Sequence, residues 1–431
     1  MIPLLITAGL LAALASPAAQ AADLTLLAHG RPAPGFTLSV FDLDQQAAYA
    51  GAPLRVPRPS NPQAPAPLVQ ARPAAQALQL TWLDSWHAGV RLVSAQPLDL
   101  SAHLAQGTVE FEWRSPDLAK AGLSVGMTCG PDCGRKVNLV AASRAQAGHG
   151  WQRTALALRC FVREGADFRQ IAQPFALETS GTGELELRRV TLRQRGTPTT
   201  TCPDATTQSV SAGPLEEVWS MDWWMPRHEK KLAEIAQRRQ AKERIGLVFI
   251  GDSITQGWEN EGQAIWARHY AKHHALNLGY GGDRTENVLW RLQHGELDGL
   301  APKAVVMMIG TNNTGDRRED PRTTAAGVRR LLAEVQQRLP GTPVLLLAVF
   351  PRDPQPGTPL RRINDQLNRQ IAGFADGKAV HFLDIGRALM NADGTLSPDV
   401  MPDWLHLSEK GYAAWAEAMA PTLDKLMATQ P

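Results

Sequence analysis

The sequence has almost no net charge and no long hydrophobic run beyond its first residues. Its 431 residues include 44 Lys and Arg and 42 Asp and Glu, which gives a formal net charge of +2. Proteins that bind nucleic acid carry a basic excess, so this balance provides no electrostatic reason to expect a nucleic-acid partner. No later segment approaches the length of a membrane span, so we expect no integral membrane segment.

Cysteine is scarce, and the four cysteines all lie before residue 203. No histidine accompanies them at the spacing of zinc ligands, which argues against the zinc site that is the alternative to disulfides. Exported proteins pair their cysteines. Cys129 and Cys133 could close a small loop and leave Cys160 to pair with Cys202, and two other connectivities remain possible.

The first residues have the pattern of an export signal. Residues 4–15 form a short apolar core, Pro17 interrupts it, and Ala19-Gln-Ala21 fits a small-x-small cleavage site. The segment before the core has no Lys or Arg, which departs from the usual signal, and the alternative is a buried apolar helix. We expect residues 1–21 to be a signal peptide and the mature protein to be periplasmic or secreted.

Residues 22–195 are predicted to form an all-β domain. Short runs of alternating apolar and polar residues recur there, punctuated by Gly, Pro and Asp, as in a β-sandwich. These runs lie at 36–40, 107–113, 153–158 and 184–192. The stretch 196–214 is rich in Thr, Ser and Pro and has the composition of a linker.

Residues 215–431 are predicted to form a second, α/β domain. Its expected strands lie at 247–251, 275–279, 303–309, 343–350 and 379–384. Its expected helices lie at 227–244, 262–274, 285–293, 322–338, 359–374 and 408–427. Because strands and helices alternate at this spacing, we expect a parallel sheet covered by helices on both faces.

Ser253 follows the first of these strands after only a short acidic turn. It would therefore lie at the carboxyl end of a parallel strand, where open α/β sheets place their ligands. A serine in that position is a candidate nucleophile if a base and an oxyanion site accompany it. The alternative is an ordinary helix cap.

Three further polar blocks follow predicted strands or precede the last helix. Gly282 lies in a glycine-rich turn, and the side-chain amide of Asn312 is a suitable oxyanion donor. Asp403 and His406 lie one turn apart, so the carboxylate can orient the imidazole. Each block alone is ordinary loop chemistry, and Asp84-Ser-Trp-His87 in the β-domain repeats the Asp-x-x-His spacing. All four blocks in order, each at a strand end, are much harder to obtain by chance.

These blocks resemble those of the SGNH (GDSL-type) hydrolases, and within them the catalytic subunits of platelet-activating-factor acetylhydrolase. Ile254 stands where the GDSL motif has Leu, which is a conservative exchange. The likeness covers residues 219–427. It is carried by Gly251-Asp-Ser253, Leu276-Asn-Leu-Gly-Tyr-Gly-Gly-Asp283, Val288-Leu-Trp-Arg-Leu292, Gly295-Glu296, Gly310-Thr-Asn-Asn313 and Asp403-Trp-Leu-His-Leu407.

The resemblance implies a flavodoxin-like three-layer α/β/α fold and ester hydrolysis through an acyl-enzyme, without metal or cofactor. It implies that Ser253 is the nucleophile, His406 the base and Asp403 the acid that orients it. The oxyanion hole would comprise the N–H groups of Ser253 and Gly282 and the amide of Asn312. A Gly-x-Ser-x-Gly elbow is absent, which argues against an ordinary α/β-hydrolase.

The β-domain resembles the galactose-binding-like sandwich at the C-terminus of some bacterial exo-acting β-glucosidases. The matching residues are 97–101, 127–130, 158–161, 165–168 and 174–177, with Trp151. Four tryptophans of this domain could stack on sugar rings or could belong to its core, namely Trp82, Trp86, Trp113 and Trp151.

Together the two resemblances predict a serine esterase that removes short acyl groups, acetyl above all, from O-acylated carbohydrate. The alternatives are a lipid or phospholipid acyl esterase and a carbohydrate-binding protein without catalysis. The expected partner is the ester substrate, and no oligomeric state is predicted.

Overall fold

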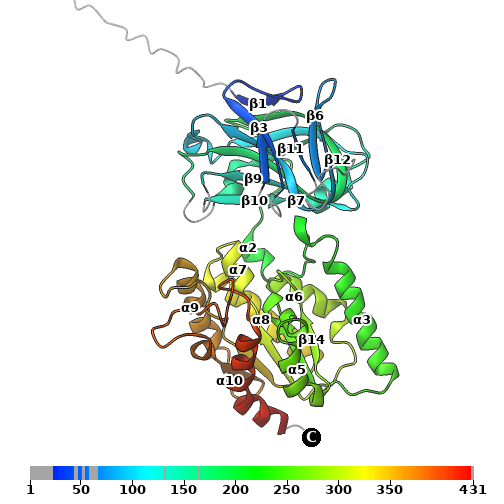
Figure 1. The fold of residues 1–431 in the computed structure, drawn as a ribbon, viewed down its shortest axis with the longest axis vertical. Coiled ribbons are helices and arrows are strands. Elements are labelled where there is room, and N and C mark those ends of the chain that lie inside the picture. Colours follow the sequence, from blue (N-terminus) through cyan, green and yellow to red (C-terminus); the bar gives the residue numbers. More distant parts are fainter. Residues whose placement is uncertain are drawn as a thin grey trace, which may run out of the picture.

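The computed structural model describes residues 23–42, 47–50, 54–57, 67–130, 133–162 and 166–428. They form an all-β body and an α/β body, stacked along the long axis of the molecule (Figure 1). The predicted signal peptide lies outside the described residues. Within these residues, no helix has both the length and the apolar character needed to cross a membrane.

The N-terminal body is built almost entirely of antiparallel strands, as predicted. The strands are β1 (Leu24–Ala28), β2 (Arg31–Pro32), β3 (Phe36–Asp42), β4 (Ala47–Ala50), β5 (Leu54–Val56), β6 (Val69–Pro73), β7 (Leu78–Ser94), β8 (Thr108–Arg114), β9 (Ala121–Thr128), β10 (Gly134–Asn138), β11 (Gln152–Ala157) and β12 (Gln173–Arg193). Three short helical elements join them, namely η1 (Ser101–His103), α1 (Val140–Gln146) and η2 (Leu158–Phe161).

Strand β12 connects the two halves of this body. Its first half pairs with β9, its second half pairs with β8 and β1, and β7 runs beside much of its length. The register of the β12–β7 pairing shifts on either side of Gly181. Its φ is 68°, a backbone conformation that glycine adopts without steric strain. A Cβ at Gly181 would also lie 2.1 Å from the Lys120 carbonyl oxygen. This glycine therefore lets one long strand bend between the two layers.

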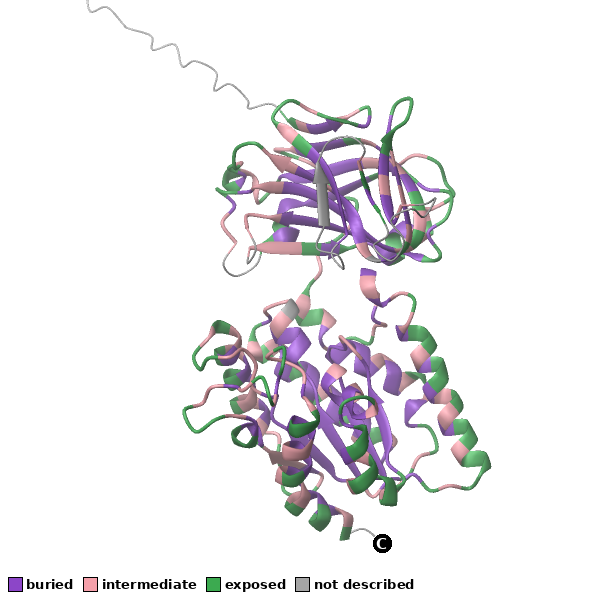
Figure 2. Cartoon of the chain, viewed as in Figure 1, coloured by how far each residue is buried: buried purple, intermediate pink, exposed green. Residues whose placement is uncertain are grey.

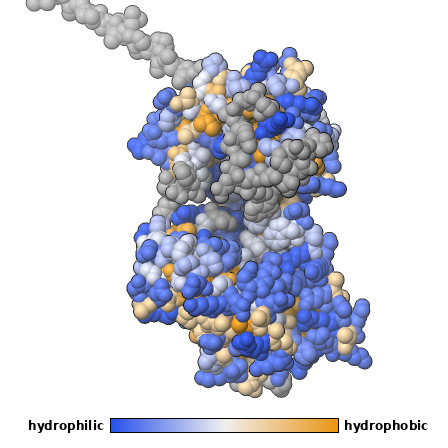
Figure 3. Space-filling view, in the orientation of Figure 1, coloured by the Kyte–Doolittle hydropathy of each residue, from blue (hydrophilic) through white to orange (hydrophobic). Residues whose placement is uncertain are grey.

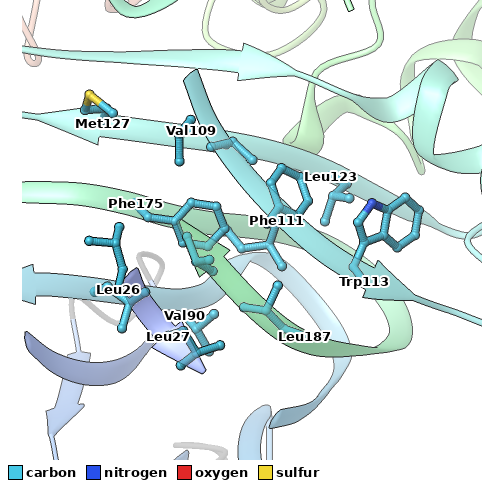
Figure 4. Packing of buried hydrophobic residues seen from close by; sticks show 14 of the residues in the cluster. Leu26, Leu27, Val90, Val109, Phe111, Trp113, Leu123, Met127, Phe175 and Leu187 are labelled. Atoms are coloured by element: carbon cyan, nitrogen blue, oxygen red, sulfur yellow. The ribbon is translucent and has the colours of Figure 1, made fainter. Parts of the chain in front are cut away.

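The core of the sandwich is continuous between its layers. Figure 4 shows Phe111 and Phe175 packed together, with ring centroids 5.4 Å apart. Trp82 and Trp113 are 2% and 1% exposed, so they belong to this core and have no surface for a sugar. Trp151 carries the guanidinium groups of Arg114 and Arg188 over its ring at 4.9 and 4.5 Å. The side chain of Trp86 is outside the described part of the chain.

The C-terminal body contains the predicted parallel sheet, in the order β14-β13-β15-β16-β17. Its strands are β13 (Leu247–Gly251), β14 (Leu276–Gly279), β15 (Ala304–Met308), β16 (Val344–Leu347) and β17 (Val380–Leu383). The longer helices are α3 (Trp224–Gln240), α5 (Gln263–His269), α6 (Thr285–Arg291), α8 (Pro321–Arg338), α9 (Pro359–Ala372) and α10 (Glu409–Ala428). Shorter ones are α2 (Ala205–Gln208), η3 (Val218–Ser220), α4 (Ser253–Gln256), η4 (Gly257–Glu259), η5 (Ala271–His273), η6 (Leu292–Glu296), α7 (Thr311–Asp316) and η7 (Gly386–Leu389).

Helices cover both faces of this sheet, so the body has three layers, as predicted. Val248 and Ile250 of β13 pack toward α3, α6, α8 and α9, whereas Leu247 and Phe249 pack toward α5 and α10. All five residues of β13 are buried, which explains why the strand is a continuous apolar run. Figure 2 shows the strands of this sheet buried between the helices.

The segment between the bodies is held on both sides. Thr199 donates its N–H to the Ala155 carbonyl of β11 at 2.9 Å, and Cys202 forms a disulfide with Cys160. Farther along, the Ser209 hydroxyl bonds Glu319 of the α/β body at 3.0 Å, and Gly213 donates its N–H to Glu286 at 3.2 Å. The first part of this segment thus lies on the sandwich and the second part on the α/β body.

The cysteine pairing in the structure gives the first testable prediction. The disulfides are Cys129–Cys133 and Cys160–Cys202, and no free cysteine remains among the described residues. Native protein unfolded without reductant should therefore release no thiol to a colorimetric titrant, and reduced protein should release four. Four thiols before reduction would contradict the pairing.

Candidate active site

The site lies where the central strands of the parallel sheet end. Gly251 at the end of β13 pairs with Gly279 of β14 and with Met308 of β15. A Cβ at Gly251 would lie 2.1 Å from the Thr255 hydroxyl oxygen and 2.5 Å from the Met308 carbonyl oxygen. Glycine is therefore required for the tight passage from β13 into the next helix, and that passage brings Ser253 to the edge of the sheet.

Ser253 is the first residue of α4. Asp252 caps this helix, because its Oδ1 accepts the Ile254 N–H at 3.0 Å. Since Asp252 supplies the cap, the Ser253 hydroxyl is left for another partner. The backbone N–H of Ser253 is at a position that has no intrahelical acceptor.

His406 links the serine to an acid. Its Nε2 lies 2.8 Å from Ser253 Oγ, and its Nδ1 lies 2.6 Å from Asp403 Oδ2. An ionised carboxylate only accepts hydrogen bonds, so it holds the imidazole proton on Nδ1. Nε2 then accepts the serine proton, which is the arrangement a hydroxyl nucleophile needs.

The Asp403–His406 turn is held by its own backbone. Asp403 Oδ1 accepts the N–H groups of His406 at 2.7 Å and Leu405 at 3.0 Å, and Trp404 adopts a φ of 64°. Partial burial opposes ionisation of Asp403, but the hydrogen bonds from His406 outweigh it and lower the pKa of the carboxyl. The acid therefore stays ionised beside the imidazole.

Residues 280–284, which we call the glycine turn, follow β14 next to the serine helix. Tyr280 donates its N–H to the Gly251 carbonyl at 3.2 Å, and Gly281 donates to the Gln256 side chain at 2.7 Å. Gly282 has a φ of 69°. Asn312 donates from Nδ2 to the Asp283 carbonyl at 2.9 Å, which joins the glycine turn to the loop after β15. A primary amide has two hydrogens, and this bond engages one of them.

A buried ion network supports the glycine turn from beneath. Asp283 Oδ2 accepts from Arg291 Nε at 2.8 Å, and its Oδ1 accepts from Trp224 Nε1 at 2.7 Å. Arg291 also contacts Glu296, and all three charged side chains are fully buried. Burial raises the pKa of Asp283 to about 6 despite the neighbouring guanidinium. Removing Arg291 would take the guanidinium away from two buried carboxylates, which is strongly destabilising.

The second Asp-x-x-His pair does not form a comparable unit. His87 Nε2 contacts Glu178 Oε2 at 2.7 Å, whereas Asp84 accepts a hydrogen bond from the Thr182 hydroxyl at 3.1 Å. The structure thus brings Ser253, His406 and Asp403 together and leaves the repeated motif inside the sandwich. Among the described residues, no group of three or more His, Cys, Asp or Glu side chains could hold a metal ion.

Two residues at the glycine turn have no counterpart in the sequence prediction. The Trp219 ring packs against Gly282, since a Cβ on that glycine would lie 1.9 Å from the ring. Glu217 pairs with Arg284 at 2.8 Å. Three tryptophans within six residues, at 219, 223 and 224, were an available signal, because such density at the start of the domain indicates packing against the rest of it.

The α/β body has matches among known proteins. Residues 249–414 match the model of the GDSL-like lipase/acylhydrolase family. Human platelet-activating factor acetylhydrolase IB subunit alpha1 is 37% identical over 216 residues, which are 50% of this chain and 89% of that protein. The chain belongs to the GDSL-like lipase/acylhydrolase family. It is a carboxylic ester hydrolase of the SGNH type, as predicted.

The sandwich has its own match. Residues 69–192 fit a model described as galactose-binding domain-like, which confirms the predicted resemblance. Among solved structures, the extra C-terminal domain of the exo-1,3/1,4-beta-glucanase ExoP from a Pseudoalteromonas species is 16% identical (TM-score 0.31), over 40% of this chain and 94% of that one. Est24, a carbohydrate acetylesterase from Sinorhizobium meliloti, is 21% identical (TM-score 0.35), over 42% of this chain and all of that one.

Asp252 should make the free energy of unfolding of the protein depend on pH. Burial raises the pKa of its carboxyl from 3.8 to about 7. Between about pH 4 and pH 7 the folded state therefore holds a proton that the unfolded chain has released, so the stability contribution of Asp252 falls as pH rises. The Tm of Asp252→Asn relative to wild type should rise across this window in thermal melts. A difference that is flat or that falls would contradict the shift.

Asp403→Asn should lower kcat by about 1,000- to 10,000-fold, because an amide neither fixes the required tautomer nor stabilises the imidazolium. Asp84→Asn is the matched control, since it changes the same motif in the sandwich and should leave kcat within about 2-fold of wild type. Hydrolysis of p-nitrophenyl acetate measures both variants. A larger loss in the Asp84 variant would reverse the assignment.

Proposed function

We propose that the protein is an exported serine esterase that removes acetyl and other short acyl groups from O-acylated carbohydrate. The observation that carries the catalytic part of the proposal is the continuous chain Ser253–His406–Asp403, with distances of 2.8 and 2.6 Å. Ser253 is the nucleophile, His406 is the general base and Asp403 orients the imidazole.

The reaction proceeds in two halves. Ser253 Oγ attacks the ester carbonyl carbon while His406 Nε2 takes the hydroxyl proton, and the carbonyl oxygen becomes an oxyanion. The N–H groups of Ser253 and Gly282 and the second hydrogen of the Asn312 amide stabilise it. His406 then gives the proton to the departing alcohol. Water, activated by the same imidazole, hydrolyses the acyl-enzyme and releases the carboxylic acid.

The carbohydrate part of the proposal is supported by the galactose-binding-like character of residues 69–192. The alternative is a lipid ester substrate, which the human acetylhydrolase relative favours by its name. An enzyme that acts at a lipid surface needs an exposed apolar patch. Among the described residues, the exposed large hydrophobic side chains are Leu24, Val162 and Met225, and the face in Figure 3 is mostly hydrophilic. These features favour a soluble polar substrate over a bilayer.

The remaining parts concern location and organisation. We propose that residues 1–21 are removed on export to the periplasm or beyond, a location in which the two disulfides are stable. We also propose a sandwich over residues 22–195, a connection over 196–214 and a hydrolase domain over 215–431. The alternative of a carbohydrate-binding protein without catalysis is disfavoured by the match to the acylhydrolase family.

One experiment separates these functions. Acetate release is measured from acetylated glycans, and acyl release is measured from acyl-ester lipids of increasing chain length. We expect turnover of the acetylated glycans and a steep fall as the acyl chain lengthens. Ser253→Ala is the background control and should lose at least about 10,000-fold in kcat, because triad members act as a unit.

Each other outcome rejects part of the proposal. Preference for the lipid esters would establish the alternative substrate class. Binding of glycans without turnover by wild-type protein would establish the binding function. A well-folded Ser253→Ala variant with near-normal turnover would overturn the catalytic assignment.

A further inference from the structure

The first residues of the proposed hydrolase domain contact the candidate oxyanion site. Residues 215–220, which we call the connecting segment, run from the end of the predicted linker to the Trp-rich start of α3. Trp219 packs against Gly282, and Trp223 lies next to Gly281, where a Cβ would be 3.2 Å from its ring. The two indoles stack at 6.0 Å with an interplanar angle of 22°, and Trp223 Nε1 donates to the Trp219 carbonyl at 3.0 Å. The pair forms one aromatic block against the glycine turn.

An ion pair fixes the far end of the same turn. Glu217 Oε1 lies 2.8 Å from Arg284 Nη1, and the Arg284 side chain is only 9% exposed. Arg284 directly follows Asp283, whose carbonyl accepts the Asn312 amide. The connecting segment therefore contacts the glycine turn both at Gly282 and beyond it.

The other side of the connecting segment is held by the sandwich. Ser180 of β12 donates its hydroxyl to the Val218 carbonyl, and Asn138 of β10 donates its amide to the Glu216 carbonyl. Gly122 of β9 lies so close that a Cβ there would be 2.7 Å from Val218 Cα. Val218 is 4% exposed in this contact. Residues on either side of Glu217 are thus anchored to strands of the all-β body.

Two consecutive glycines cannot fix their own geometry, because glycine has the widest backbone freedom of any residue. An oxyanion donor, however, works only if its N–H is already oriented toward the developing charge. The neighbours of Gly281 and Gly282 must therefore fix the geometry of the turn. Gln256 accepts the Gly281 N–H, Trp223 and Trp219 pack against the two glycines, and Glu217 holds Arg284 at the end of the turn.

We propose that Trp219 and Glu217 are positioning residues of ester hydrolysis, which orient the Gly282 N–H toward the oxyanion, and that the β-sandwich holds them in place. This inference rests on the proposed role of Gly282 as an oxyanion donor. It makes the sandwich a support for the chemistry on every substrate, including small esters that no sugar-binding surface could recognise.

The test uses the full chain and p-nitrophenyl acetate. Trp219→Ala should lower kcat by about 10- to 100-fold with little change in KM, because a displaced oxyanion donor is lost only in the transition state. Trp219→Phe keeps a ring against Gly282 and should recover most of the rate. Glu217→Gln should lower kcat by about 3- to 10-fold, since it retains size but weakens the pair with Arg284.

A second measurement separates positioning from general loss of structure. The serine hydroxyl adds to the carbonyl of an alkyl trifluoromethyl ketone and gives its proton to His406, which leaves a hemiketal oxyanion. The affinity for this ketone therefore reports the oxyanion site, whereas acetate reports product binding. The ketone inhibition constant should rise in each variant by the same factor as kcat falls, with acetate inhibition unchanged. Ser180→Ala combined with Asn138→Ala should give the same signature at about 3- to 10-fold, because both side chains donate hydrogen bonds to carbonyls of the connecting segment.

Matched controls come from sandwich residues that have no described contact with the connecting segment. Trp151→Ala removes another partly exposed tryptophan, and Glu186→Gln removes the carboxylate that pairs with Arg114 at 2.9 Å. Both should retain wild-type kcat, KM and ketone affinity.

The outcomes are decisive in each direction. An inactive wild type, or an active Ser253→Ala, overturns the proposed function itself. An active wild type with an inactive Ser253→Ala but an unaltered Trp219→Ala overturns only the positioning role. A loss of kcat without a matching loss of ketone affinity also overturns the positioning role. If Trp219→Ala lowers kcat but the Ser180–Asn138 double variant does not, the sandwich does not hold the connecting segment in place for catalysis.

Discussion

The parallel pairing of β13 with β14 and β15 is the constraint on which the site depends. Gly251 is in register with Gly279 on one side and Met308 on the other, so three strands end at one level. Every polar block of the site leaves the sheet from that edge or reaches it from the last loop. A shift of one residue in this register would turn the side chains of β13 to the opposite faces and separate the serine from its neighbours. Gly251 favours the observed register, because a larger residue in its place would meet the Thr255 hydroxyl and the Met308 carbonyl.

Much of this architecture was predictable because burial on both faces leaves a clear sequence pattern. The run Leu247–Gly251 is apolar throughout and forms β13 with the predicted bounds. The short helices α4 and α7 were not predicted, because their polar residues and glycine have the composition of turns. Ser253, Asp403 and His406 were accessible only as a combination of blocks, since each block alone is common. Their catalytic roles remain predictions.

Contacts between residues far apart in the sequence could not be predicted from local sequence patterns. The packing of Trp219 on Gly282 joins residues more than sixty positions apart, and no periodicity encodes it. The network of Asp283, Arg291 and Glu296 likewise consists of charged residues, in the glycine turn and the helical segment after it, that would ordinarily be assigned to the surface. These charges are buried because they satisfy one another beneath the glycine turn. Sequence patterns indicate which faces of helices and strands are apolar. A buried ion network depends instead on which polar side chains pair in the core of the folded protein.

The route of the chain between the two bodies has a consequence for how such a protein can evolve. The backbone contacts the sandwich at Thr199, the α/β body at Ser209, the sandwich again at Val218 and the α/β body again at Trp219. A domain that is attached by a single flexible linker can be exchanged by simple recombination. Here a replacement would also have to present hydrogen-bond donors to the Glu216 and Val218 carbonyls and a residue as small as Gly122 between them. The two bodies are therefore expected to be inherited as a pair, and their contacting surfaces to change together.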